Sequence, residues 1–303
     1  MKLITVRRSE LETFRQCPLK HKLQWIDQWR PVHSSSAADL GTDWHLVLAW
    51  HYGRIMEAQH QGTPVPDPEQ ILQEVCGRID QVWLQEDPEH WAKLRWMYEG
   101  YFDYWGVDPH WRVLAVEVTQ TIRLRDENGD DTRFVFEWTT DLRVQDLELS
   151  GEPQVVVDHK STKQPLGKSD IDLQDQYGSY TLAERRIGNP ILMQVANQTK
   201  TEKLKRPMTL AERNVRTPGY RTDRELRNIE LDLLGVAEAA YPETPRRLYS
   251  SPDPRTCSWK CDVQNAHLAL RKGALGMDQI PTLMRMHGFE QKEAPSGTDL
   301  NRH

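Results

Sequence analysis

The chain of 303 residues carries 45 acidic and 39 basic side chains, a formal net charge of −6, and 38% hydrophobic residues. Its mean hydropathy of −0.73 is that of a polar globular protein, and no apolar run approaches the roughly 20 residues that a membrane-spanning helix needs. The acidic sum argues mildly against nucleic acid as a partner. However, an enzyme that must release its product can be acidic overall and basic only along its channel.

Residues 1–112 are predicted to be mostly helical. The first helix would begin at a capping-box pattern formed by Ser9 and Glu12 and would run towards Cys17. Another helix opens near Gly41 and His45. Of the eleven tryptophans, most precede Trp138, several of them at helix-like spacing. They are interpreted as the core of a helical subdomain, with stacking on single-stranded DNA bases as the alternative.

Residues 113–146 have the pattern of a β-hairpin. Two β-rich runs, 113–125 and 132–146, flank the segment DENGDD, which contains the strong turn signal Asn128-Gly129. The run Val155–Thr162 is predicted to be the next strand. Asp141 and Asp158 would then lie on neighbouring strands, where two carboxylates can share one divalent cation. The alternative for Asp141 is a polar strand end paired with a nearby arginine.

The most informative motif is D-x-K at residues 158–160. The period-2 geometry of a strand puts Asp158 and Lys160 on one face and His159 on the other. An acid that holds a hard cation and a lysine that steadies an anion suit a metal-assisted phosphodiester hydrolase. The alternative is a solvated strand end.

The rest of the chain alternates between helices and one further strand. A helix is predicted over residues 170–188, with Gln176 and Tyr180 on one face. A strand follows Pro190, and residues 220–241 form a long helix before a proline-rich loop at 242–254. Basic residues gather at 200–206 and 212–227, where they line either a DNA channel or ordinary solvated faces.

Five motifs occur in a fixed order: S-x-L-x-x-F-x-x-C-P (9–18), G-x-x-x-H (41–45), Asp141, D-x-K (158–160) and Q-x-x-x-Y (176–180). This set resembles the RecB-like branch of the PD-(D/E)XK nuclease superfamily. The nearest likeness is to CRISPR-associated iron–sulfur exonucleases and their phage or mobile-element relatives. The resemblance runs from about residue 9 to about residue 270. It departs at FEWTTD, where relatives often carry a glycine shortly before the acid.

The resemblance implies an α/β fold with a restriction-endonuclease-like core, in which helices flank a central mixed sheet, and an N-terminal helical subdomain. It also implies Mg²⁺ or Mn²⁺ held by His45, Asp141, Asp158 and the backbone carbonyl of His159. Lys160 would position water or stabilise the transition state, while Gln176 and Tyr180 would border the DNA. Glu117 is interpreted as an outer acid of this site or as a solvent-facing residue.

The four cysteines are Cys17, Cys76, Cys257 and Cys261. The polar start of the chain predicts a cytoplasmic location, where disulfides are rare, and Cys76 is interpreted as a small core residue. In the iron–sulfur relatives, one cysteine lies in an N-terminal C-P and three lie in a C-terminal cluster. Cys17, Cys257 and Cys261 match three of these, and His267 stands where relatives often place the fourth ligand. The set is a site for a 4Fe–4S cluster or structural Zn²⁺, or it is degenerate or lost.

We therefore expect a metal-dependent deoxyribonuclease, favoured as an exonuclease acting on single-stranded DNA or duplex ends in recombination, repair or replication. A single domain is expected over residues 1–288, comprising a helical part (1–112), the catalytic sheet and helix (113–200) and a C-terminal cysteine-containing part (201–288). Residues 289–303 would be a disordered tail. The sequence does not decide whether a helicase or a recombination protein is a partner, and no membrane association is expected. The alternatives are a catalytically decayed DNA-binding or assembly module and a protein that binds metal through its cysteines alone.

Overall fold

The computed structural model describes residues 2–32, 36–202, 208–243, 257, 261–274 and 276–292. They fall into two compact units. The first unit is built mainly from Ser36–Leu231, and the second from Ile4–Ser35 together with the chain after Leu231. The expectation of one domain over residues 1–288 stays a prediction.

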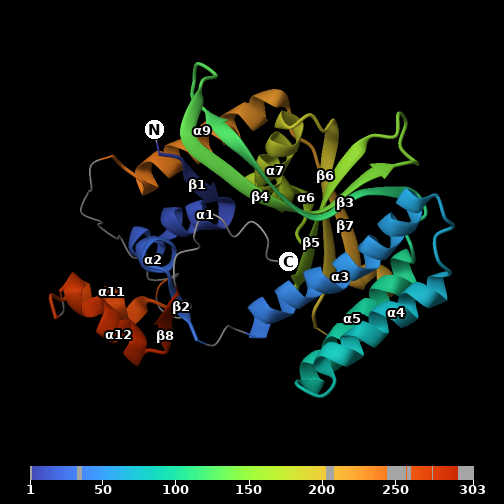
Figure 1. Ribbon diagram of the computed structural model, residues 1–303, viewed down its shortest axis with the longest axis horizontal. Coiled ribbons are helices and arrows are strands. Elements are labelled where there is room, and N and C mark those ends of the chain that lie inside the picture. Colours follow the sequence, from blue (N-terminus) through green and yellow to red (C-terminus); the bar gives the residue numbers. More distant parts are fainter. Residues whose placement is uncertain are drawn as a thin grey trace. The chain divides into compact units, whose positions relative to one another are not determined.

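A mixed β-sheet forms the centre of the first unit (Figure 1). The strands that belong to this unit lie in the order β3 (Trp111–Arg125), β4 (Asp131–Asp146), β5 (Gln154–Thr162), β6 (Ile191–Lys200) and β7 (Asn214–Gly219). The β5–β6 pair is parallel, whereas β3–β4, β4–β5 and β6–β7 are antiparallel. This confirms the predicted α/β fold with a central mixed sheet.

Helices cover both faces of this sheet (Figure 1). One face packs against α3 (Ser36–Gln61), α4 (Pro68–Trp83) and α5 (Pro88–Trp105), and the other against α6 (Lys168–Leu173) and α7 (Asp175–Arg186). The strand period separates the two layers, since Val195 belongs to the first core and Ala196 to the second. A short helix, α8 (Leu210–Arg213), precedes β7.

Tryptophans of the helical segment pack in the first of these cores. Trp44, Trp83 and Trp111 are buried there, and Trp91, Trp96 and Trp105 pack partly buried against the same cluster. Their spacing therefore reflects core packing, as the subdomain interpretation predicts. None of the helices within the described ranges combines the length and the apolar character that crossing a membrane requires.

The predicted hairpin between β3 and β4 is confirmed. Gly129 adopts φ +88° in the turn, a conformation that glycine reaches without steric cost. The side chain of Asp126 accepts hydrogen bonds from the amides of Asn128 (2.9 Å) and Asp130 (3.0 Å). The Asn-Gly pair and the aspartate before it thus fix the turn.

The expectation of a single helix over residues 170–188 is wrong, because two helices, α6 and α7, meet at Gln174. The backbone of Gln174 is extended (φ −88°, ψ 112°). The guanidinium of Arg221 donates hydrogen bonds to the main-chain carbonyls of Ile171 (2.7 Å) and Asp172 (2.9 Å). These carbonyls would otherwise accept bonds from the next helical turn, so an arginine distant in sequence ends α6.

The second unit combines a segment from the N-terminal part of the chain with its C-terminal part. Its elements are β1 (Ile4–Arg7), α1 (Arg8–Gln16), α2 (Pro18–His21), a π-helical turn η1 (Lys22–Ile26), β2 (Trp29–Pro31), the second half of α9 (Asp223–Ala240), α11 (Gln264–Arg271), η2 (Met277–Gln279), α12 (Ile280–Met286) and β8 (Phe289–Gln291). A small core joins the N-terminal and C-terminal parts, and β2 pairs with β8 antiparallel.

Two expectations for this unit need correction. The first helix begins at Arg8, not at Ser9, and the amide of Arg7 donates to the Glu10 side chain (3.4 Å). Residues 289–291, expected at the start of a disordered tail, form β8 because Phe289 is buried in the small core. Residues 293–303 of that expected tail lie outside the described residues.

Gly100 of α5 lies against a buried arginine. A Cβ atom at this position would lie 2.2 Å from Nη2 of Arg213. This guanidinium stacks on the ring of Trp96 (3.9 Å) and donates to the Trp96 carbonyl (2.6 Å), so it cannot retreat without losing both contacts. We predict that Gly100→Ala lowers the free energy of unfolding by about 1–3 kcal/mol in chemical denaturation, as overpacking typically does.

Gly53 of α3 is the matched control. A Cβ atom there would meet nothing within 4 Å, so Gly53→Ala should stabilise the protein by about 1 kcal/mol through helix propensity. A Gly100→Ala variant as stable as Gly53→Ala would contradict the close packing of Arg213.

Candidate metal centre

The candidate site lies where three strands and a helix of the first unit bring acidic and basic side chains together. Asp141 belongs to β4, and Asp158 and Lys160 belong to the neighbouring β5. The β4–β5 ladder runs from Gln145–Gln154 to Leu142–Val157. The aspartates therefore come directly after the last ladder pair, where the two strands are free to separate around a ligand.

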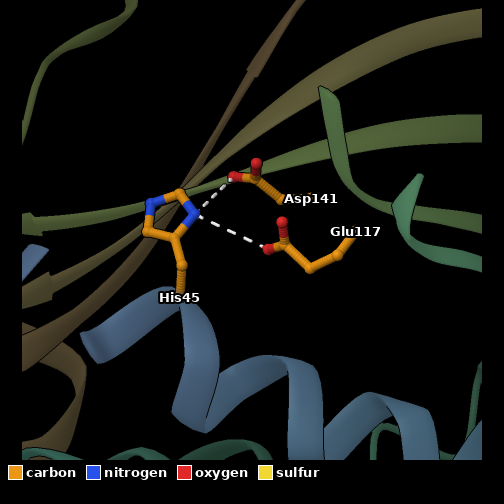
Figure 2. A group of neighbouring side chains, drawn as sticks. All are labelled: His45, Glu117 and Asp141. Carbon is orange, nitrogen blue, oxygen red and sulfur yellow. Dashed lines mark ion pairs between the residues drawn. The ribbon is translucent and has the colours of Figure 1, made fainter. Parts of the chain in front are cut away.

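The side chains of His45, Glu117 and Asp141 converge (Figure 2). Nδ1 of His45 lies 3.3 Å from Oδ2 of Asp141 and 3.8 Å from Oε1 of Glu117. One ligand atom from each residue lies within 4.8 Å of the others, and no second group of this kind occurs among the described residues. A nitrogen and two carboxylate oxygens form a donor set suited to a divalent cation.

Glu117 reaches this cluster through an uncommon backbone conformation. It lies in β3 between the pairs Val116–Leu142 and Val118–Thr140, and so opposite Asp141. Its φ of +49° is left-handed, which costs a residue with a side chain about 1–3 kcal/mol and occurs preferentially at functional sites. Both interpretations of Glu117 hold, since its carboxylate lies beside His45 and its side chain is also exposed to solvent.

Asp141 is held as a carboxylate. The backbone amide of His159 donates to its Oδ2 at 2.8 Å. Burial alone would raise the pKa of Asp141, but His45 and this amide lower it below its ordinary value. The group is therefore ionised at neutral pH although it is buried.

His45 carries a positive charge between its acidic neighbours. Burial opposes protonation, but Asp141 and Glu117 raise the pKa of His45 to about 10. The imidazolium thus provides the positive charge that a divalent cation would bring to the same two carboxylates. A cation bound through Nδ1 would replace this proton, since metal-ligating histidines are neutral.

Asp158 lies outside the three-residue group and pairs with Lys160. Nζ of Lys160 lies 2.9 Å from Oδ2 and 3.1 Å from Oδ1 of Asp158, and Nε2 of Gln176 donates to Oδ1 at 3.0 Å. Burial raises the pKa of Asp158, Lys160 lowers it and Asp141 raises it further, with a net shift upwards. Asp158 also raises the pKa of Lys160 against the effect of burial, so the lysine keeps its charge.

Tyr177 of α7 packs in the second core of the sheet, with Ile171 and Ala196. It is buried, and burial together with Asp158 raises the pKa of its hydroxyl. Tyr180, the tyrosine of the Q-x-x-x-Y motif, is half-buried in the same helix. Gln176 of the same helix is the residue whose side chain binds Asp158.

The ring of His159 lies on the opposite face of β5, as the strand period predicts. It is buried, and burial lowers the pKa of His159 to about 3, so the imidazole is neutral. The metal-binding role of its carbonyl stays a prediction.

Three of the five arginines of the basic segment 212–227 point into the protein, whereas Arg224 is exposed. Arg213 and Arg221 are buried and the side chain of Arg216 is only 10% exposed, each in contacts with the protein itself. They therefore do not form the basic channel that was one interpretation of this segment. Residues 203–207 of the other basic segment lie outside the described part of the chain.

The cysteine site stays a prediction. Cys17 is buried in the core of the second unit, and Cys261 packs against that core. Burial is the main cause that raises the pKa of Cys261, with a contribution from nearby Cys257, and His267 is buried in α11. Within the described ranges, no three ligand atoms of this set come within 4.8 Å of one another. Residues 258–260 lie outside these ranges.

Comparison with known proteins gives one family match. A model of the PD-(D/E)XK nuclease superfamily matches residues 8–266. Among solved structures, one named "Putative exonuclease" from Eubacterium rectale is 11% identical with a TM-score of 0.43, and the match covers 86% of this chain and 93% of that one. SSO0001 is 10% identical with a TM-score of 0.39, covering 86% and 84%. No curated protein matches the sequence.

We predict that Glu117→Gln weakens binding of Mn²⁺ by at least about 10-fold, because loss of even an outer partner of a metal ligand typically costs 10–100-fold. Isothermal titration calorimetry of the metal-free protein with Mn²⁺ measures the dissociation constant.

Glu127→Gln is the matched control for this measurement. Glu127 is exposed at the turn of the same hairpin and should bind Mn²⁺ as the natural protein does. Equal affinity in Glu117→Gln and Glu127→Gln would remove Glu117 from the metal site.

Proposed function

Because the chain belongs to the PD-(D/E)XK nuclease superfamily, we propose that it is a Mg²⁺- or Mn²⁺-dependent deoxyribonuclease that acts as an exonuclease. The observation that carries this proposal is the convergence of His45, Glu117 and Asp141 beside the ion pair of Asp158 and Lys160. The exonuclease activity and the RecB-like branch rest on the ordered motif set. DNA ends and single strands are the proposed substrates.

The residues present fit a divalent cation. Three carboxylates, those of Glu117, Asp141 and Asp158, lie in one partly buried region, where the charge of Asp141 raises the pKa of both Glu117 and Asp158. Burying like charges is costly unless a cation compensates for them. His45, Glu117 and Asp141 would hold the ion, with Asp158 as a further proposed ligand. When bound, such an ion polarises the scissile phosphate and lowers the pKa of a coordinated water.

Lys160 supplies the second positive charge of the site. Its ammonium is held by both oxygens of Asp158, which keeps it protonated in a buried position. There it neutralises negative charge that develops on the phosphate as the bond to water forms. Gln176 fixes the orientation of Asp158 by donating to the oxygen that also contacts the lysine. The side chain of Gln176 thus positions Lys160 indirectly.

Retention of these charges favours an active site over a decayed one. A buried carboxylate such as Asp158 would be relieved of its desolvation cost by an apolar replacement. The chain instead keeps Asp141, Asp158 and Lys160 together with a strained backbone at Glu117.

The proposed function is tested by cleavage of labelled DNA. With Mn²⁺ or Mg²⁺, the protein should degrade linear single-stranded or duplex DNA and leave covalently closed circular DNA intact, whereas EDTA should stop the reaction. Cleavage of closed circles would contradict the exonuclease assignment, and no cleavage of any DNA would contradict the deoxyribonuclease assignment.

We further predict that Asp158→Ala and Lys160→Ala each lower the cleavage rate by about two to four orders of magnitude while leaving the fold intact. Single-turnover assays with saturating Mn²⁺ and circular dichroism of the same preparations measure both effects. Lys163→Ala is the control, since Lys163 is an exposed lysine that pairs with Glu202 and should be dispensable. Full activity in Lys160→Ala would contradict the catalytic role assigned to Lys160.

A further inference from the structure

A row of polar side chains is buried behind the candidate site, on the face of the sheet opposite Asp158 and Lys160. His159 of β5 is the ladder partner of Asn197 of β6, and Asn197 is the partner of Arg216 of β7. Because directly paired residues share a face of the sheet, the three side chains form a line across adjacent strands. All three are almost entirely removed from solvent.

The charged end of this row is fixed by residues at the junction of α5 and β3. Arg216 makes two hydrogen bonds of 2.7 Å with the carboxylate of Asp108. Its guanidinium lies 3.6 Å from the ring centroid of Trp105 and 3.9 Å from that of Trp111. Since Arg216 has only donors, the bond from its Nε to Oδ1 of Asn197 (3.3 Å) determines which way the Asn197 amide points.

With the Asn197 amide oriented, the donor and the acceptor of each hydrogen bond from Asn197 to Asp108 can be assigned. Nδ2 of Asn197 donates to the hydroxyl of Tyr101 (2.8 Å). The hydroxyl of Tyr52 donates to Asp108 (2.6 Å), so Tyr101 must donate to Tyr52 (2.5 Å). Arg216 closes the cycle between Asp108 and Asn197. A network in which every member is satisfied is rigid and fixes one arrangement of its residues.

This cycle ends on His159. The second hydrogen of Asn197 Nδ2 is directed to Nδ1 of His159 (2.9 Å), so Nδ1 accepts and the neutral ring carries its proton on Nε2. The same ring stacks on Tyr52, with centroids 5.7 Å apart and planes 9° from parallel. Held at its edge and its face, the side chain of His159 leaves the backbone little freedom. That backbone donates the amide that binds Asp141 at 2.8 Å.

We propose that Asp108, Arg216 and Asn197 are positioning residues, which hold the backbone of His159 and thereby the carboxylate of Asp141 in the geometry that binds the divalent cation. This inference rests on the proposed metal-dependent function. A buried ion pair adds little stability compared with apolar residues of the same volume. Its retention here is explained by the hydrogen-bond geometry that it imposes on the D-x-K strand.

The test is the affinity for Mn²⁺, measured by isothermal titration calorimetry on metal-free protein. Asn197→Ala should raise the dissociation constant by about 10–100-fold, the usual effect of losing an outer partner of a metal site. The control is Asn214→Ala. Asn214 is equally buried in the neighbouring strand, but its amide binds the Gly100 carbonyl (2.9 Å) and Thr199 (3.1 Å). This variant should lose thermal stability and keep its affinity for Mn²⁺.

A second variant removes the same hydrogen bond from the other side. His159→Phe keeps the ring on Tyr52 and leaves no cavity, so it decides the question even if Asn197→Ala does not fold. It should bind Mn²⁺ as weakly as Asn197→Ala, and the double variant should be no weaker, because the two groups act through one bond. Unchanged affinity in His159→Phe, or an equal loss in Asn214→Ala, would overturn the proposal.

The calorimetric result is separable from the nuclease assignment. A natural protein that binds Mn²⁺ but cleaves no DNA would refute the proposed function and leave the positioning role to be decided by the variants. A natural protein that binds no Mn²⁺, with Asp141→Asn as the reference for a disabled site, would refute both.

Discussion

The hydrogen bond from the amide of His159 to Asp141 is the interaction on which the candidate site depends. It joins β4 and β5 just beyond the end of their ladder, where main-chain pairing no longer fixes the separation of the two strands. With Asp141 held there, His45 of α3 and Glu117 of β3 converge on one point. The strand period alone puts Asp158 and Lys160 on one face of β5 and the ring of His159 on the opposite face.

The charges on the two sides of this bond are balanced differently. On one side, the His45 imidazolium faces two carboxylates, and the pKa of Asp141 is lowered although burial opposes its ionisation. On the other side, Lys160 compensates only part of the burial of Asp158, whose pKa stays raised. Asp141 is thus ionised more easily than Asp158. A cation bound between the two carboxylates would favour the ionised form of both.

Much of this arrangement follows from local sequence signals. Asn128-Gly129 specifies the hairpin, and period-2 alternation separates Asp158 and Lys160 from His159. Glu117 could not be placed by the same reasoning. An unbroken ladder from a two-residue turn would put Val116 opposite Asp141, whereas a register shift between Arg123 and Arg125 brings Glu117 to that position. Bulges of this kind depend on packing that the local sequence does not encode.

The division of the expected helix into α6 and α7 was missed for a related reason. The helical pattern of residues 170–188 is continuous, and only hydrogen bonds from Arg221, some fifty residues later, divide it into α6 and α7. The buried cycle through Asp108 and Arg216 likewise joins residues 108 positions apart in the chain. Such contacts form only in the folded chain, and the periodicity of the sequence does not reveal them.

The most direct measurement of the central claim is the location of a bound metal ion. A crystal of the protein soaked in Mn²⁺ and measured by anomalous diffraction should show a peak within about 2.0–2.4 Å of ligand atoms from His45, Glu117 and Asp141. A peak coordinated elsewhere, with His45 still paired with Asp141 and Glu117, would contradict the account.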